Sequence, residues 1–282
     1  MTQPRTVLGA ALLLSAALSG ACAAESPAPP TATSAAPATP EVIVRDDLRS
    51  VFGKAGLRGS FAMVDVASGR TTVVDRARAE RRLAPASTFK IAHALIALET
   101  GAAKDEDEVI PYGGEPQRLP KWERDMTLGE AITTSNAAIF RTLAHRIGPE
   151  KERQWLRRLG YGNGQVGKDI ERFWVDGPLK ISAVEQGRFL SRFAGLRLPV
   201  AKKNLLLVRD MLKVEQKNGY TLYAKTGWSD TFDPQIGWWA GWVENGDRIS
   251  AFALNLDITT DADAEQRIPL ARDLLRALDA LP

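Results

Sequence analysis

Strand-like sequence lies near both ends of this 282-residue chain, and helix-like sequence fills the part between them. The strand-like runs are rich in aromatic, β-branched and other apolar residues and span residues 61–66, 71–74, 220–225, 236–243 and 248–257. Turn-forming residues separate the first two runs and also the last two, where Asn245-Gly246 marks the turn, so each pair predicts a hairpin. We therefore expect an α+β fold: an antiparallel β-sheet flanked by helices, with a mainly helical subdomain from the middle of the chain.

Helical periodicity begins close to residue 87. Apolar residues there recur at the spacing of one helix face, at Ile91, Ala94, Leu95 and Leu98. Four more helices are predicted in the middle of the chain, over residues 127–134, 149–159, 182–193 and 200–214. Residues 264–278 are predicted to form a final amphipathic helix.

The first 23 residues have the form of a secretory signal peptide. One early positive charge, Arg5, precedes an apolar run over residues 7–18, and an Ala-x-Ala cleavage site ends at Ala23. Residues 24–41 are rich in Ala, Pro, Ser and Thr and are predicted to be a linker. Residues 42–282 then form the domain. They contain no run of eighteen unbroken apolar residues, so we expect no integral membrane segment in a mature chain that is periplasmic or secreted.

Cys22 is the only cysteine, and it leaves two interpretations open. Ordinary cleavage after Ala23 would discard it, whereas lipidation of Cys22 would make the mature protein a membrane-anchored lipoprotein. In either case the predicted domain holds no cysteine, which excludes disulfides, a thiol nucleophile and thiolate metal sites. Because the chain has only two histidines, His93 and His145, a zinc site is not expected, and we predict no metal.

The charge pattern does not indicate a nucleic-acid partner. The net charge is +3, and positive and negative residues are interspersed along the chain. No stretch combines basic and aromatic residues in the way that nucleic-acid binding requires. A mildly basic enzyme can still favour small anionic substrates. The sequence leaves the oligomeric state open.

Ser87-Thr88-Phe89-Lys90 stands where the helical pattern begins. The unpaired N–H groups and the positive dipole end of a helix favour negative charge at Ser87. Lys90 follows about one turn later, so its amine can approach the serine oxygen. Serine is a weak nucleophile without a base, and lysine can be that base only if its pKa falls or if it is chemically converted.

Lys225-Thr226-Gly227 is predicted at the end of a strand. A lysine and a hydroxyl at this place can hold a substrate carboxylate, and the glycine admits a close approach of another backbone. Each motif alone is common. Ser-x-x-Lys followed by Lys-Thr-Gly is the pairing of penicillin-recognising acyl enzymes.

Longer stretches resemble the class D (oxacillinase-type) serine β-lactamases. They are Ser-Thr-Phe-Lys at 87–90, Tyr-Gly-Asn at 161–163, Phe-Trp-Val-Asp-Gly-Pro-Leu-Lys-Ile-Ser at 173–182, Lys-Thr-Gly-Trp at 225–228 and Gly-Trp-Trp-Ala-Gly-Trp-Val-Glu at 237–244. The resemblance runs from about residue 42 to the C-terminus. Tyr-Gly-Asn and the tryptophan-containing loop separate class D from class A, whose Ser-Asp-Asn triplet is absent from this sequence.

The resemblance implies a catalytic role for four residues. Ser87 forms the acyl-enzyme with a small-molecule β-lactam. Lys90 reacts with CO₂, so that it becomes N6-carboxylysine and acts as general base; CO₂ or bicarbonate is the only cofactor implied. Ser135 shuttles a proton toward the β-lactam nitrogen. Trp174 stabilises the carboxylated lysine, because its indole N–H is a hydrogen-bond donor only.

The resemblance also implies the substrate-binding residues. Lys225, Thr226 and Gly227 belong to the carboxylate site, which Arg272 in the last helix is expected to complete, with Arg267 as the competing choice. Backbone N–H groups of Ser87 and Trp228 are expected to form the oxyanion hole. Tyr161-Gly162-Asn163 is assigned to the architecture of the site and not to its chemistry.

One position departs from the family pattern, which usually reads Ser-x-Val at the proton shuttle. Here the triplet is Ser135-Asn136-Ala137. Ala137 removes apolar volume beside Lys90, which predicts a wetter pocket where the lysine is more readily protonated. His93 and His145 are expected to pack and not to act as bases, because His93 falls opposite the apolar stripe of its helix.

The activity implied is hydrolysis of β-lactam antibiotics, which confers resistance to them. Two alternatives share Ser-x-x-Lys and Lys-Thr-Gly: a penicillin-binding D,D-peptidase and a non-hydrolysing β-lactam sensor domain. The Tyr-Gly-Asn triplet and the tryptophan loop argue against the peptidase. The lack of a predicted membrane span after the signal peptide argues against the sensor.

Overall fold

The computed structural model describes residues 41–217 and 219–282. The predicted signal peptide, Cys22 and residues 24–40 of the predicted linker lie outside the described residues, so these boundaries stay predictions. No helix within the described ranges is both long enough and apolar enough to cross a membrane.

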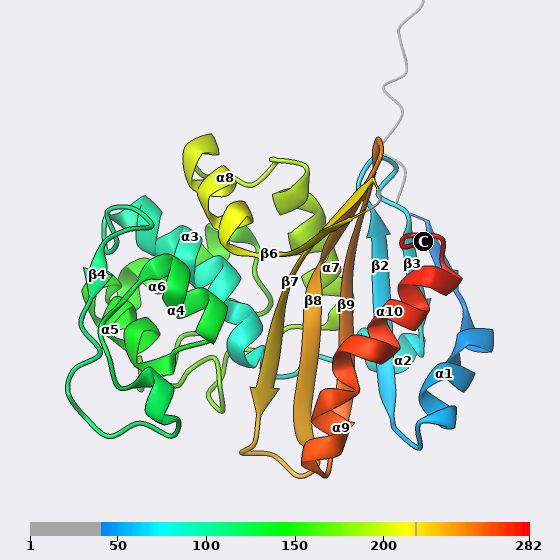
Figure 1. Cartoon of the computed structure of the whole chain (residues 1–282), viewed down its shortest axis with the longest axis horizontal. Coiled ribbons are helices and arrows are strands. Elements are labelled where there is room, and N and C mark those ends of the chain that lie inside the picture. The colour runs from blue at the N-terminus through cyan, green and yellow to red at the C-terminus, as the bar shows by residue number, and fades with distance from the viewer. Residues whose placement is uncertain (1–40, 218) are drawn as a thin grey trace, which may run out of the picture. The chain divides into compact units, whose positions relative to one another are not determined.

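The described chain contains a twisted, mostly antiparallel sheet with the order β1-β3-β2-β9-β8-β7-β6 (Figure 1). Its strands are β1 (Val42–Val44), β2 (Gly59–Asp65), β3 (Thr71–Val74), β6 (Lys213–Lys217), β7 (Tyr220–Ser229), β8 (Gln235–Asn245) and β9 (Arg248–Ile258). Both predicted hairpins are present, as β2–β3 and β8–β9. The two halves of the sheet join where β2 pairs with β9, with Gly59 opposite Leu256.

The helices are shared between the sheet and the helical subdomain. They are α1 (Arg49–Lys54), α2 (Arg76–Ala79), α3 (Lys90–Thr100), α4 (Leu128–Thr134), α5 (Ala137–Ile147), α6 (Pro149–Leu159), α7 (Ala183–Ala194), α8 (Lys202–Met211), α9 (Asp261–Glu265) and α10 (Arg267–Ala277). Short 3-10 turns occur at Asp46–Leu48, Ala86–Phe89 and Pro120–Trp122, and a small two-stranded sheet joins β4 (Val109–Ile110) to β5 (Met126–Thr127).

The sheet is covered on both faces. Helices α1 and α10 lie on one face and α7 lies on the other (Figure 1). Side chains of a strand alternate between the two faces, so neighbouring residues enter different cores. On β8, Trp238 and Trp242 pack in the core that includes α7, whereas Trp239 packs in the core beneath α10. The α+β class predicted from the sequence is confirmed.

Several predicted boundaries were wrong, and each has a local cause. The predicted helix 200–214 ends at Met211, because Lys213–Lys217 pairs instead with β7 as the edge strand β6. The predicted helix 264–278 is two helices, since a capping box of Thr260 and Asp263 starts α9 before α10 begins. Helix α5 was not predicted.

Candidate active site

Ser87 lies in the 3-10 turn Ala86–Phe89, directly before α3. The preceding residue, Ala86, has a positive φ of 49°, an uncommon conformation for a residue with a side chain. Its N–H donates to the carbonyl of Trp174 at 2.8 Å, which ties the turn to the loop that contains this tryptophan. Ser87 is part-exposed although its neighbours are buried. The turn therefore presents one hydroxyl to solvent from a fixed backbone.

Gly227 lets strand β7 run against this turn. A Cβ at this position would lie 3.1 Å from the carbonyl oxygen of Pro85 and 3.2 Å from the backbone nitrogen of Thr88. The Lys-Thr-Gly motif lies inside β7, which continues to Ser229, so its predicted place at a strand end was wrong. Strand β8 also contacts the residues just before this turn, because the indole N–H of Trp238 donates to the carbonyl of Ala84 at 2.8 Å.

Lys90 lies beside the hydroxyl of Ser87, with 3.0 Å between Nζ and Oγ. Its side chain is buried, with 1% of the residue exposed. Burial places the pKa of Lys90 well below its usual range, and the positive charges of Lys225 and Arg141 lower it further. A lysine with a lowered pKa can be an uncharged amine at neutral pH, so Lys90 can accept a proton or react with an electrophile.

Ser135 brings a second hydroxyl to the site from the end of α4. It adopts a left-handed conformation with φ of 59°, and its Oγ lies 3.0 Å from Nζ of Lys225. Burial lowers the pKa of Lys225 to about 7, with a smaller contribution from the positive charge of Arg267. Asn136 holds this corner, since its Oδ1 accepts from the N–H of Ala138 at 2.9 Å as the N-cap of α5.

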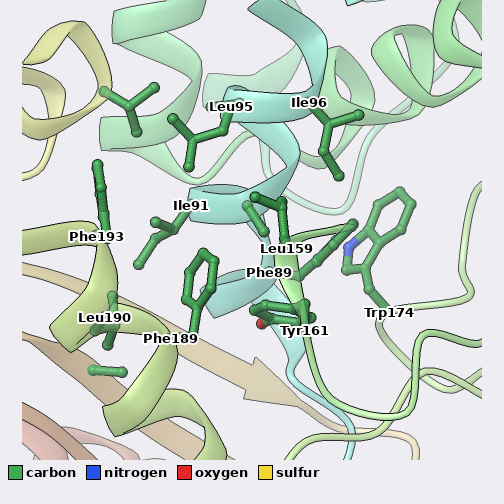
Figure 2. Close-up of a cluster of buried hydrophobic side chains, with 14 of the residues drawn as sticks. Phe89, Ile91, Leu95, Ile96, Leu159, Tyr161, Trp174, Phe189, Leu190 and Phe193 are labelled. Atoms are coloured by element: carbon green, nitrogen blue, oxygen red, sulfur yellow. The ribbon is translucent and has the colours of Figure 1, made fainter. Parts of the chain in front are cut away.

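Aromatic side chains form the buried wall around the first turn of α3. Figure 2 shows Phe89, Tyr161 and Trp174 gathered beside this turn. The ring centroids of Phe89 and Trp174 are 5.7 Å apart, and Nζ of Lys90 lies 5.2 Å from the ring centroid of Phe140. Lys90 is buried beside this wall, and Phe140 is the aromatic ring that lies near its amine.

The Tyr-Gly-Asn triplet and Ala137 were both predicted to affect the architecture of the site around Lys90. Asn163 binds the tryptophan loop through its side chain, donating to the carbonyl of Pro178 at 2.8 Å and accepting from the N–H of Lys180 at 3.0 Å. This agrees with an architectural role for Tyr-Gly-Asn. Ala137 is part-exposed, but Lys90 is buried and its pKa is lowered by burial, so the wetter pocket predicted from Ala137 is not seen at the lysine.

Arg272 is not at this site, so its predicted placement was wrong. Its guanidinium binds Glu215 of the edge strand β6, with 2.9 Å between Nη2 and Oε2. Arg267, the competing choice, reaches the site instead: its Nη1 donates to the carbonyl of Gly227 at 2.7 Å. Five residues along a helix are about 7.5 Å of rise and about 140° of rotation, so the two arginines reach different places: Arg267 lies at Gly227, near the end of β7, and Arg272 lies beside Glu215 of β6.

The side chains converge on a hollow of about 410 Å³ that opens to solvent. It is lined by Ser87, Arg118, Leu119, Lys121, Trp122, Thr133, Thr134, Ser135, Thr226, Gly227, Trp228 and Arg267. Sequence reasoning missed the lining residues between 118 and 122, because that segment has no periodicity and no motif. The indole N–H of Trp122, which donates to the carbonyl of Thr134 at 3.1 Å, fixes this segment to the end of α4.

Neither histidine lines the hollow. His93 is fully buried, with its Nε2 2.7 Å from Oε1 of Glu152, which is also fully buried. The expectation that His93 packs is confirmed, and α3 is buried on all sides from Lys90 to Ala97, so the face opposite its apolar stripe is covered as well. His145 is on the surface beside Glu171 and does not pack in the core. Among the described residues, no group of His, Cys, Asp and Glu is arranged to hold a metal ion.

The chain matches one family profile, described as the penicillin binding protein transpeptidase domain, over residues 59–276. It is 37% identical to β-lactamase OXA-5 of Pseudomonas aeruginosa over 79% of this chain and 83% of that protein. It is 35% identical to β-lactamase OXA-48 of Klebsiella pneumoniae over 73% of this chain and 77% of that protein.

Solved structures show the same likeness. The class D β-lactamase FUS-1 (OXA-85) of Fusobacterium nucleatum subsp. polymorphum superposes with a TM-score of 0.81 at 35% identity, covering 84% of this chain and 99% of that one. The class D β-lactamase YbXI of Nostoc gives a TM-score of 0.80 at 35% identity, covering 83% and 99%.

Proposed function

The chain belongs to the class D serine β-lactamases, enzymes that hydrolyse β-lactams, and from this premise we propose that Ser87 is its acylated nucleophile and carboxylated Lys90 its general base. The observation that carries the proposal is the contact of a part-exposed serine with a buried lysine, 3.0 Å between Oγ and Nζ. Burial supplies what this chemistry needs, since only an uncharged amine reacts with CO₂.

In the first half of the reaction, Oγ of Ser87 attacks the β-lactam carbonyl carbon, and carboxylated Lys90 takes the hydroxyl proton. The carbon–nitrogen bond of the ring then breaks, the leaving nitrogen takes the hydroxyl proton of Ser135, and the proton that Lys90 took from Ser87 replaces it. Backbone N–H groups of Ser87 and Trp228 hold the oxyanion. In the second half, Lys90, again an unprotonated carbamate, removes a proton from water, and the water oxygen attacks the ester carbonyl carbon. The same proton then returns to Oγ of Ser87 as the ester bond breaks and the ring-opened acid leaves.

The carboxylate of the β-lactam nucleus is placed against Lys225, Thr226 and Arg267. Arg267 can bind it with two parallel hydrogen bonds, because the guanidinium is a planar fork of donors. Trp174 is assigned to the carboxylated lysine, as the buried indole that stands beside Phe89. Export through residues 1–23, with Cys22 either discarded or lipidated, remains part of the proposal.

The test is turnover of a chromogenic cephalosporin together with intact-mass spectrometry. We expect multiple turnovers with the native chain, and with a slowly hydrolysed β-lactam one adduct that peptide mapping places on Ser87. Ser87→Ala should form no adduct. A single stoichiometric burst would indicate a sensor, very slow turnover would indicate a D,D-peptidase, and an adduct on another residue would refute the assignment of Ser87.

A further inference from the structure

The hollow that holds Ser87 carries more positive charge than a β-lactam nucleus requires. Its lining includes Arg118, Lys121 and Arg267, and no carboxylate side chain is among the described residues that line it. The nucleus brings one carboxylate, which the proposed function assigns to Arg267 together with Lys225 and Thr226. Arg118 and Lys121 are left at the rim without an anion from the nucleus to bind.

Arg118 is held at this rim by two contacts. Its Nη1 donates to Oδ2 of Asp230, in the loop after β7, at 2.5 Å. Its guanidinium carbon also lies 5.7 Å from the ring centroid of Trp228, a distance at which the positive charge is attracted to the indole face. These contacts orient a long side chain that would otherwise lose considerable conformational freedom on binding a ligand.

The guanidinium of Arg118 keeps donors that Asp230 does not occupy. A guanidinium has five N–H groups, and the contact with Asp230 involves Nη1. The side chain of Arg118 is 59% exposed, so the remaining donors are accessible to a molecule in the hollow. Arg118 can therefore take a second carboxylate without losing its anchor.

Arg118 and Arg267 are separated by a span that one small molecule can bridge. The guanidinium carbon of Arg267 lies 5.6 Å from the same indole centroid, so the two guanidinium carbons are at most about 11 Å apart. A bicyclic substrate with one carboxylate on its nucleus and another on its acyl side chain has charges at its two ends. Trp228, which both arginines contact, is also part of the lining of the hollow.

We propose that Arg118 is a specificity-determining residue that binds a carboxylate on the acyl side chain, so that this enzyme favours β-lactams with two carboxylates. The inference rests on the proposed function, because Ser87 and Arg267 must orient the nucleus. Asp230 positions Arg118, but its negative charge also repels the incoming carboxylate, although the two bind different N–H groups of the guanidinium. Removing Arg118 should therefore weaken binding of the dicarboxylate, and removing the charge of Asp230 should strengthen it.

The experiment compares two substrates that differ only by the second carboxylate: benzylpenicillin and its α-carboxy derivative, carboxybenzylpenicillin. With Arg118→Ala we expect KM for the dicarboxylate to rise about tenfold, the lower range for a lost charged hydrogen bond at an exposed site, while KM for benzylpenicillin stays within about twofold. With Asp230→Asn, KM for the dicarboxylate should fall. Added salt should reduce the preference in the native enzyme.

Arg153→Ala is the matched control, since Arg153 is another arginine in a surface ion pair, with Glu150 on α6, and does not line the hollow. It should change KM for neither substrate, which separates a local effect from the loss of one net charge. Two results would overturn the proposal and mean that the ion pair only shapes the rim. One is that a variant changes KM for both substrates alike; the other is that Arg118→Ala and Asp230→Asn change KM for the dicarboxylate in the same direction. Hydrolysis of neither substrate by the native chain would instead refute the proposed function itself.

Discussion

Lys90 sets the pH at which the proposed reaction can run. Its folded-state pKa is lowered by burial, so the amine is uncharged above that lowered value and protonated below it. Carboxylation consumes the uncharged amine, so activity should fall as the pH drops through the lowered pKa, and bicarbonate should restore part of it. A general base contributes about 10²–10⁴ in rate, so Lys90→Ala should leave any acyl-enzyme long-lived.

The carboxylated lysine can be observed directly. After addition of ¹³C-bicarbonate, ¹³C NMR should show a carbamate signal in the native chain and none in Lys90→Ala. The signal and the activity should decline together as the pH is lowered. Active enzyme without this signal, and without any response to bicarbonate after acid treatment, would rule out Lys90 as a carboxylated base.

Arg267 and Arg272 make a second test at the scale of single residues. Arg267→Ala removes the guanidinium that reaches Gly227. We expect kcat/KM to fall, with a loss of transition-state stabilisation of roughly 1.5–3 kcal/mol. Arg272→Ala is the matched control on the same helix, because its partner is Glu215 and it does not line the hollow. Steady-state kinetics decide between them, and the reverse ranking would return Arg272 to the carboxylate site.

Single residues also show where sequence reasoning stops. The two motifs were enough to predict that Ser87, Lys90 and Lys225 act together, because each motif fixes a residue type at a defined spacing. Arg267 could not be chosen over Arg272 without knowing where α10 begins. Glu152 was missed altogether, since the sequence around it resembles an ordinary exposed helix and only the packing of α6 on α3 brings it to His93.

At the scale of elements, β7 and β8 pass each other so closely at Gly241 that no other residue fits. A Cβ there would collide with the carbonyl oxygen of Tyr223 and lie 2.6 Å from Cα of Ala224. Gly241→Ala must therefore push apart the strand that carries Lys225. We expect it to lower the free energy of unfolding by about 2–5 kcal/mol, measured by chemical denaturation.

Gly53→Ala is the control for this substitution. Gly53 lies in α1, and a Cβ there would have no heavy atom within 4 Å. Alanine is a better helix former than glycine, so stability should stay the same or rise by up to about 1 kcal/mol. Equal losses for both variants would show that the close approach of the two strands has no special cost.

Element boundaries were predictable where a cap is written in the sequence. Thr127 with Glu130 and Ser182 with Glu185 form capping boxes, and the helices predicted there begin one residue after each cap. Helix α5 has a simpler signal in its N-cap, Asn136, which also belongs to the Ser-Asn-Ala triplet. The edge strand β6 has mostly exposed residues, so only its pairing with β7 defines it.

At the scale of the whole molecule, the fold class followed from where the strand-like runs lie. Two hairpins far apart in the sequence, with helical sequence between them, favour one sheet packed with helices. The sequence could not decide which strands meet. That depends on the burial of both faces, as in the pairing of β2 with β9, where Phe61 and Leu254 face each other.

That pairing also sets the order in which the protein can be completed as it is synthesised. The partner of Gly59 is Leu256, about 200 residues later, so the central edge of β2 stays open until almost the whole chain has left the ribosome. An open strand edge is a template for association with other chains, and contacts of such long sequence separation form slowly. A nascent chain stalled before residue 248 would contain Ser87, Lys90 and Lys225 and still lack the β9 strand against which β8 and β2 are aligned.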